Sequence, residues 1–347
     1  MRREWRGRAA LFLLADLLLP SSACTGPEGP ATGPRVVVLG TMQDGGLPHA
    51  ACDCRRCERA RVDPAAKRLV ASLGIVLPRE GEVYLVDATP DVVPQLAALR
   101  AALNRAAEEP EEALGGVDRA PLDGVFLTHA HMGHYLGLAH FGLEAVHTRR
   151  LPVWGTPRML EFLRGNGPWE QLVRLGNLEL RELAPGRGAP GPAVELGAGV
   201  EQGAGVDLGE GVSVAAVAVP HRDEYSDTVG FVIRGPRRVV LYVPDTDAWD
   251  AWPVPPEEVI AAAGVGVALL DGTFHSGDEL PGRDLSKVRH PFVAASVERF
   301  APLAERGVDV RFLHFNHTNP AVDPDAGLEE RLPAGFRFAR EGDEISL

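Results

Sequence analysis

The chain has 347 residues, of which 45% are hydrophobic and 24% are charged, so it can form one large core or two ordinary domains, and a disordered or fibrous protein is excluded. Its formal net charge is -13, and acidic residues are spread along the whole chain, which argues against nucleic acid as a general partner. A small-molecule or short-peptide substrate fits this charge better.

Residues 1–34 have the features of an export leader and tether. A basic stretch, MRREWRGR, precedes an apolar run that is too short to span a bilayer, and small residues come before Cys24. These small residues resemble a bacterial lipoprotein cleavage site, which implies a periplasmic or membrane-anchored protein with a lipidated Cys24. Asp16 interrupts the apolar run and Ser21 stands where that pattern prefers Leu. A plain signal peptide and a cytoplasmic protein remain as alternatives.

From residue 35 on, short β-branched runs alternate with helical segments, and neither a repeat nor a second signature indicates another domain. In the first half, strands are predicted at 35–40, at 68–78 and 82–88 around the turn PREGE, and at 122–131. A helix is predicted at 91–109, with Pro94 near its first turn, and a helix or helical turn at 135–146.

The second half begins with a different composition. Residues 184–211 are rich in Gly, Pro and Ala, which predicts a loop or loose hairpin insertion. Further strands are predicted at 212–221, 228–234, 237–245, 265–272 and 308–317. Many strands, fewer helices and polar residues at strand ends predict a layered α/β sandwich, with residues 35–347 as a single domain.

Side chains of the types that bind metals follow the predicted strands. They are Asp87, His129, His131, His134, His221, Asp245, Asp271, His314 and His317. A single histidine at a strand end is more often a surface or core residue than a ligand, but packing alone gives no reason for three imidazoles in THAHMGH. Rigid strands that end in ligand-bearing loops suit a metal site, and imidazole suits Zn, Mn and Fe.

The segment THAHMGH resembles the H-x-H-x-D-H signature of the metallo-β-lactamase superfamily, from about residue 35 to the C-terminus. The resemblance implies an αββα four-layer sandwich and one or two active-site divalent metals. The implied ligands are His129, His131 and His221 for one ion, His134 and His314 for a second, and Asp245 as the bridge. It also implies that Asp87 orients the histidine loop, and that His221 and Asp245 fix a water that attacks an ester, phosphodiester or amide as metal-bound hydroxide.

Gly133 departs from the signature, because the family has a metal-binding Asp at that place. Three protein ligands suffice for catalytic zinc. The site is therefore expected to be mononuclear, to be binuclear with a weaker second metal, or to use a carboxylate from elsewhere, such as Asp91 or Asp44.

A second pattern, C-x-C-x2-C, places Cys52, Cys54 and Cys57 close enough to share a metal. GTMQDGGLPHAACDC, LLDGTFHSGDEL and LHFNHTNPAVD are most similar to the superfamily branch that contains proteins of coenzyme PQQ synthesis and phosphodiesterases of bacterial phosphonate breakdown. In that branch such cysteines join a late histidine in a structural zinc site, which implies His317 as the fourth ligand. The alternative is a disulfide plus an odd thiol.

Three functional hypotheses follow. The first is a metal-dependent hydrolase. The second is an iron-dependent oxygenase in pyrroloquinoline quinone biosynthesis, which Gly133 favours by weakening a binuclear site and which export disfavours. The third is a non-catalytic binding lipoprotein on a degenerate hydrolase fold, because a fold does not determine a function. The sequence does not indicate an oligomeric state.

Overall fold

A computed structural model of the protein describes residues 33–106, 121–185, 195–196, 200–201, 205–280, 282, 284 and 287–347. The predicted export leader with Cys24 and most of the predicted insertion lie outside these residues. Residues Ala31–Leu347 form one compact unit. Within the described part of the chain, no helix is both long enough and apolar enough to span a membrane.

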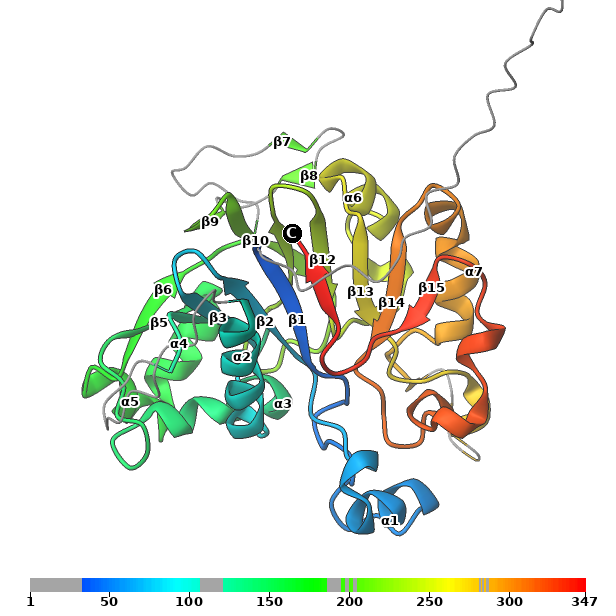
Figure 1. Ribbon diagram of the computed structural model, residues 1–347, viewed down its shortest axis with the longest axis horizontal. Helices are drawn as coiled ribbons and strands as arrows, with labels where there is room; N and C mark the ends of the chain where they lie inside the picture. The colour runs from blue at the N-terminus through cyan, green and yellow to red at the C-terminus, as the bar shows by residue number, and fades with distance from the viewer. Residues whose placement is uncertain are drawn as a thin grey trace, which may run out of the picture. The chain divides into compact units, whose positions relative to one another are not determined.

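Two seven-stranded sheets dominate the described residues (Figure 1). The first has the order β16 (Glu344–Ser346), β1 (Arg35–Gly40), β2 (Ser72–Leu77), β3 (Glu82–Val86), β4 (Gly124–Phe126), β5 (Leu151–Gly155) and β6 (Leu178–Glu182). The second has the order β15 (Phe336–Phe338), β14 (Asp309–Leu313), β13 (Val267–Asp271), β12 (Val239–Val243), β11 (Thr228–Arg234), β10 (Val212–Val219) and β9 (Val206–Gly209). A separate antiparallel pair joins β7 (Glu195–Leu196) and β8 (Val200–Glu201).

Each sheet is half antiparallel and half parallel, so that several strands end at the same edge. β1 to β3 pair antiparallel, whereas β3, β4, β5 and β6 run parallel. The second sheet repeats this arrangement, with β10 to β12 antiparallel and β12 to β15 parallel. The loops that follow the parallel strands therefore collect at one edge, which is where polar side chains can converge.

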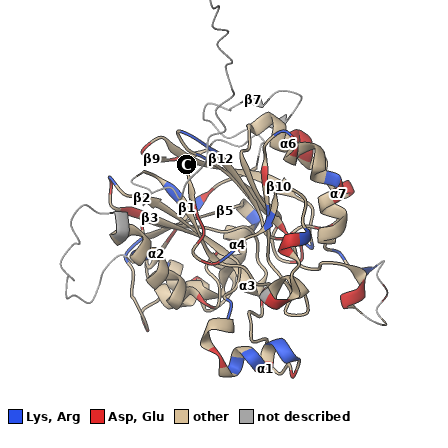
Figure 2. Cartoon of the chain, turned by 45° about the vertical axis from the view of Figure 1, so that its right-hand side comes forward, with Lys and Arg blue, Asp and Glu red and all other residues tan. Residues whose placement is uncertain are grey.

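Most helices cover the outer faces of the two sheets, whereas α1 (Arg55–Val62) lies apart from both faces (Figure 1). The other helices are α2 (Val92–Ala106), α3 (Met132–Tyr135), α4 (Pro157–Gly165), α5 (Trp169–Arg174), α6 (Pro256–Ala263) and α7 (Val293–Ala304). Short 3₁₀ helices are η1 (Pro64–Ala66), η2 (Leu136–Phe141), η3 (Trp249–Ala251), η4 (Gly277–Glu279), η6 (Pro320–Val322), η7 (Pro324–Ala326) and η8 (Glu329–Arg331). Figure 2 shows basic and acidic residues together on α1 rather than a face of one sign.

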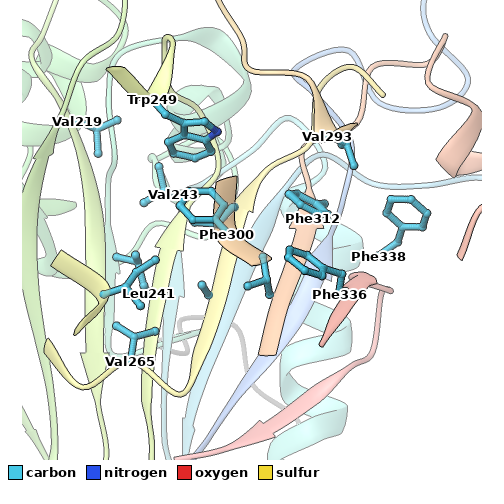
Figure 3. Packing of buried hydrophobic residues seen from close by; sticks show 14 of the residues in the cluster. Val219, Leu241, Val243, Trp249, Val265, Val293, Phe300, Phe312, Phe336 and Phe338 are labelled. Carbon is cyan, nitrogen blue, oxygen red and sulfur yellow. The ribbon is translucent and has the colours of Figure 1, made fainter. Parts of the chain in front are cut away.

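The apolar core has three layers, which explains the near-continuous hydrophobic strands. Val36 and Val38 of β1 point between the sheets, whereas Val37 and Leu39 point toward the helices outside, because successive side chains alternate across a strand. Behind the second sheet, Trp249 packs against Phe300 of α7 with ring centroids 5.1 Å apart (Figure 3). Helix, sheet, sheet and helix thus form the expected αββα sandwich, which confirms the predicted fold class.

The predicted strands all form, but two segments differ in detail. The strand predicted at 122–131 is regular only over Gly124–Phe126, because the chain then turns into the histidine loop. The helical turn predicted at 135–146 is the 3₁₀ helix η2, which follows the four-residue helix α3.

Candidate metal sites

The predicted site residues lie where strands of both sheets end. Asp87 directly follows β3, and His314 directly follows β14. Both residues adopt left-handed backbone conformations with φ of 65°, which is uncommon outside glycine and turns each side chain sharply away from its strand. His221 and Asp245 stand two residues beyond β10 and β12. Strand ends on the two facing sheets therefore converge on one site.

The three histidines of THAHMGH occupy a short loop and the turn after it. His129 and His131 follow β4, with His131 in an extended conformation, and His134 lies in α3. His129 Nε2 lies 2.9 Å from His131 Nδ1, and the planes of the two rings are 80° apart. Asp87 holds the loop, because its carboxylate accepts hydrogen bonds from Thr128 N at 2.8 Å and from the Thr128 hydroxyl at 3.0 Å. Asp87 is fully buried and contacts His134 rather than the centre of the site.

Each of the five predicted histidine ligands has one ring nitrogen fixed by the protein. The contacts are His129 Nδ1 to Thr128 Oγ1 at 3.0 Å, His131 Nε2 to Glu224 Oε2 at 3.1 Å, His134 Nδ1 to Asp87 Oδ2 at 2.8 Å, His221 Nδ1 to Asp247 Oδ1 at 3.1 Å and His314 Nδ1 to Thr273 Oγ1 at 3.0 Å. Metal-binding histidines in proteins are oriented in this way by a second hydrogen bond.

In four of these histidines the opposite nitrogen faces Asp245. Its Oδ2 atom lies 3.2 Å from His221 Nε2, 3.4 Å from His129 Nε2, 3.9 Å from His314 Nε2 and 4.0 Å from His131 Nδ1. In the described part of the chain, Nε2 of His134, His221 and His314 is buried and makes no hydrogen bond. Burying such atoms unpaired is costly, so these atoms fit the coordination of a cation.

Burial and charge leave the rings in different protonation states. Burial lowers the pKa of His129 well below its usual value, and the pKa of His314 is also lowered by burial, so both are neutral, as a metal ligand must be. Burial opposes the protonation of His134 as well, but the Asp87 carboxylate outweighs it and raises the pKa to about 9. His314 and His290 overcome the burial of Asp245 and hold the pKa of that carboxyl well below its usual range.

Asp44 lies beside Gly133, where the family signature has its carboxylate. Its Oδ1 accepts a hydrogen bond from Gly133 N at 3.1 Å and lies 3.8 Å from His134 Nε2. A Cβ atom on residue 133 would stand only 2.1 Å from this oxygen. Asp44, His134 and His314 place one ligand atom each within 4.8 Å of one another. The Asp44 carboxylate thus fills the space of the missing side chain.

Asp91, the other carboxylate considered from the sequence, points elsewhere. Its Oδ2 accepts a hydrogen bond from Val70 N at 2.9 Å. Among the described residues it belongs to no cluster with metal-ligand spacing.

Two further residues belong to the site, and only the second of them was missed from the sequence. Asp271, at the end of β13, is fully buried and accepts hydrogen bonds from Thr273 N at 2.8 Å and Thr246 N at 3.1 Å. His290 Nδ1 lies 2.9 Å from Asp271 Oδ2 and 3.3 Å from Asp245 Oδ1. Asp271 follows an apolar strand, as Asp87 does, and this pattern indicated it as a candidate ligand without assigning it a role. His290 was missed because it lies in VRHPFV, where no other potential ligand stands at metal-binding spacing.

The cysteine cluster forms a second, separate set of donors. Cys52, Cys54 and Cys57 are free thiols in the structure, which favours the predicted metal cluster over the alternative of a disulfide plus an odd thiol. Their Sγ atoms lie 3.5, 3.8 and 3.8 Å from His317 Nδ1. A tetrahedral zinc with its usual bond lengths separates sulfur and nitrogen ligands by roughly 3.6 Å. The spacing therefore fits a closed Cys3His metal site.

The protonation of this cluster fits the same conclusion. Burial raises the pKa of the Cys57 thiol to about 12, so a neighbouring cation is needed to keep it as a thiolate. Burial lowers the pKa of His317, which keeps its imidazole neutral. Both donor sets support binding of divalent metals.

Comparison with known proteins agrees with this arrangement. A sequence family described as "Beta-lactamase superfamily domain" matches residues 83–300. Coenzyme PQQ synthesis protein B of Rhodopseudomonas palustris is 26% identical over 345 residues, covering 90% of this chain and 99% of the relative. The protein of the same name from Methylobacterium radiotolerans is 26% identical over 332 residues, covering 90% of this chain and all of the relative.

Solved structures show the same fold. Zn²⁺-bound PqqB from Methylobacterium extorquens superimposes with a TM-score of 0.66 at 21% identity, over 90% of this chain and 100% of that chain. A diphosphatase of the PhnP family superimposes with a TM-score of 0.60, also at 21% identity, over 90% of this chain and 98% of that chain. These matches confirm the resemblance that the sequence motifs indicated.

Proposed function

The chain belongs to the β-lactamase superfamily, and we propose that it is a metal-dependent hydrolase of an ester, phosphodiester or similar bond. One observation carries the proposal: five histidines each have one ring nitrogen held by the protein, and the other nitrogen of four of them lies within 4.0 Å of the buried Asp245, while that of His134 lies 3.8 Å from Asp44. The structural neighbour that is a diphosphatase supports a substrate with phosphorus–oxygen bonds.

The donor atoms divide into two ion sites. His129, His131 and His221 would hold the first ion, and His134, His314 and Asp44 the second. Asp245 Oδ2 lies within 4.0 Å of a nitrogen of His129, His131, His221 and His314, which suits a ligand shared by both ions. Zn, Mn and Fe are the candidate metals, because each accepts imidazole and carboxylate ligands.

Ions bound here would lower the pKa of a coordinated water and polarise the bond under attack. The residues around them keep the ligands in place. Asp247 and Glu224 hold His221 and His131 from outside, and Thr273 holds His314. Asp271 fixes His290 beside Asp245, so that the imidazole and the carboxylate keep their relative positions. Held in this way, the donors need little reorganisation during the reaction.

The hydrolase is tested by metal content and by activity on aryl esters and bis-aryl phosphates. His129→Ala/His131→Ala should lose the first ion and at least 100-fold in kcat/KM. His140→Ala is the matched control, because His140 is an exposed histidine on η2 outside the site. Wild-type protein that holds Zn, Mn or Fe and is inactive on the whole panel would contradict the proposal. If the double variant kept its metal content and every phenotype, a non-catalytic binding lipoprotein would be the better hypothesis.

A role in coenzyme PQQ synthesis is the second candidate, because relatives of that name match 90% of this chain. An oxygenase of this kind would use iron and consume oxygen with a tyrosine-containing peptide, whereas a hydrolase would work without oxygen. Assays with and without oxygen therefore separate the two. The cellular location of the protein also separates the hydrolase from the oxygenase. A protein exported through residues 1–34 could not take part in a synthesis that runs in the cytoplasm. We propose export, and fractionation of a tagged full-length chain tests it.

A further inference from the structure

Two segments of the chain connect the cysteine cluster to the second ion site. The first runs from Asp44 to the cysteines, and the second carries both His314 and His317. Asp44 and His314 face His134, whereas the far ends of the same two segments supply all four ligands of the Cys3His cluster. The two donor sets therefore share their backbone supports.

The two segments are hydrogen-bonded to each other between the sites. Phe315 N donates to Thr41 O at 2.8 Å, and Gln43 N donates to Phe315 O at 2.9 Å. The Asn316 side chain donates from Nδ2 to Gln43 Oε1 at 2.6 Å. Gln43 immediately precedes Asp44, so this contact fixes the start of the Asp44 loop relative to the histidine segment.

His49 packs the other end of the loop onto the cysteine cluster. Its backbone N–H points at Cys57 Sγ at 3.3 Å, and its ring lies 4.6 Å from the His317 ring, centroid to centroid. A Cβ on Gly45 would stand 2.5 Å from the His49 ring, so the residue after Asp44 is in close contact with it. Asp44 is thus held between Gln43 on one side and the Gly45–His49 contact on the other.

The first ion site has different supports. His129 and His131 follow β4, and His221 follows β10. Their outer contacts go to Thr128, Glu224 and Asp247, none of which belongs to the two segments. Loss of order in the cysteine cluster should therefore reach the second ion site and spare the first.

We propose that metal in the Cys52–Cys54–Cys57–His317 cluster holds Asp44 and His314 in position and so sets the affinity of the second active-site ion. This inference rests on the proposed function, because it requires the second ion site. Without the metal, the Asp44 loop is tied down only by hydrogen bonds and packing, and misplaced ligands or supporting contacts commonly cost 10-fold to 100-fold in metal affinity.

The test uses Mn²⁺ as the probe, because thiolates select zinc whereas Mn²⁺ prefers nitrogen and oxygen ligands. Zinc and manganese per chain are measured by elemental mass spectrometry, and Mn²⁺ affinities by titration. Wild type should hold one zinc and two Mn²⁺. Cys52→Ser/Cys54→Ser/Cys57→Ser should lose the zinc, keep one Mn²⁺ at unchanged affinity and bind the other at least 10-fold more weakly.

Asn316→Ala removes the contact between Asn316 and Gln43 while all four zinc ligands remain. It therefore tests the proposal even if the cysteine variant does not fold. It should keep the zinc and bind the second Mn²⁺ several-fold more weakly. Arg59→Ala is the matched control, because it removes the 3.0 Å ion pair between α1 and Asp325 and leaves the Gln43–Asn316 contact intact. Its two Mn²⁺ affinities should equal those of wild type.

The outcomes separate the two proposals. Wild-type affinity for both Mn²⁺ ions in Asn316→Ala and in a folded cysteine variant would overturn this inference and leave the hydrolase standing. Equal weakening of both ions would also overturn it, since the first site would then depend on the same supports. A wild type that binds Zn²⁺ only at the cysteines, and no Mn²⁺, would overturn the hydrolase and this inference together.

Discussion

Position 133 and Asp44 compete for one space, which makes the missing carboxylate testable. In Gly133→Asp the new Cβ would stand 2.1 Å from Asp44 Oδ1 and 2.8 Å from Asp44 Cα. We expect the variant to displace Asp44, to lose about 1–3 kcal/mol of stability through overpacking and to bind the second ion more weakly. Asp44→Ala alone should also weaken that ion, by at least 10-fold.

Combining the two substitutions provides the decisive comparison. Gly133→Asp/Asp44→Ala should bind the second ion more tightly than either single variant, because the new carboxylate then takes the space that Asp44 leaves. Mn²⁺ titration and urea unfolding measure the two effects separately. Additive losses in the double variant would show that Asp44 does not stand in for the missing side chain.

Burial distinguishes two of the carboxylates that orient histidines, Asp87 and Glu224. Asp87 is fully buried and bonded to Thr128 and His134, whereas the Glu224 side chain is 48% exposed. Asp87→Asn should cost about 3 kcal/mol in the free energy of unfolding, because it breaks a buried charged network, and should weaken the second ion. Glu224→Gln should weaken the first ion several-fold with little change in stability. Equal effects of the two variants in chemical denaturation would contradict this distinction.

The sequence predicted most ligands because each directly follows an apolar strand. His129, His221, Asp245 and His314 are placed by local pattern, and the αββα class follows from the order of strands and helices. The position of Asp44 depends on a loop meeting α3 from far along the chain, which no local pattern encodes. His290 is brought to Asp245 by the segment between β13 and α7, and only the folded chain shows that contact.

At the scale of elements, short β4 positions the histidine loop through one close contact. Gly124 lies under Trp154, and a Cβ there would stand 2.2 Å from the indole. Trp154 in turn stacks on Phe126 with centroids 4.7 Å apart. Gly124→Ala should therefore shift the indole or the strand and cost about 1–3 kcal/mol. Both ion affinities should fall, because His129 and His134 follow this strand.

Gly165→Ala is the control for that substitution. Gly165 is the last residue of α4, and a Cβ there meets nothing within 4 Å. Alanine at this place should leave ion binding unchanged and stability equal or slightly higher, since alanine is the better helix former. Thermal melts and Mn²⁺ titrations of both variants check the pair, and a Gly124→Ala protein as stable as wild type would contradict the packing argument.

Several elements escaped prediction because their partners are distant. β16 is three residues long and pairs with β1 from the opposite end of the chain, so its stability comes from tertiary pairing and not from its own sequence. The helices α6 and α7 are amphipathic segments, and neither was predicted, because only strands and a loop were expected in the second half of the chain. Their apolar faces become evident once Val259 and Phe300 pack on the second sheet.

At the scale of the whole molecule, bound ions would join the two sheets. His129 and His134 come after β4 of the first sheet, whereas His221, Asp245 and His314 come after strands of the second. Between the sheets, Phe126 packs on Phe231 with centroids 5.8 Å apart, so the same pair of layers is already held by an apolar core. Ion binding and core packing should therefore stabilise the same cooperative unit.

Removal of metal tests this coupling. A ligand present at 100 times its Kd stabilises a folded protein by about 2.7 kcal/mol, so chelation should lower the Tm by several degrees while unfolding stays a single transition. In His129→Ala/His131→Ala the chelator should have a smaller effect, because only the cysteine cluster and the weaker second site lose their ions. Calorimetry with and without chelator measures both proteins. A wild-type Tm that does not change on chelation would show that the ions do not hold the sheets together. Two separate unfolding transitions would show that the two sheets unfold independently.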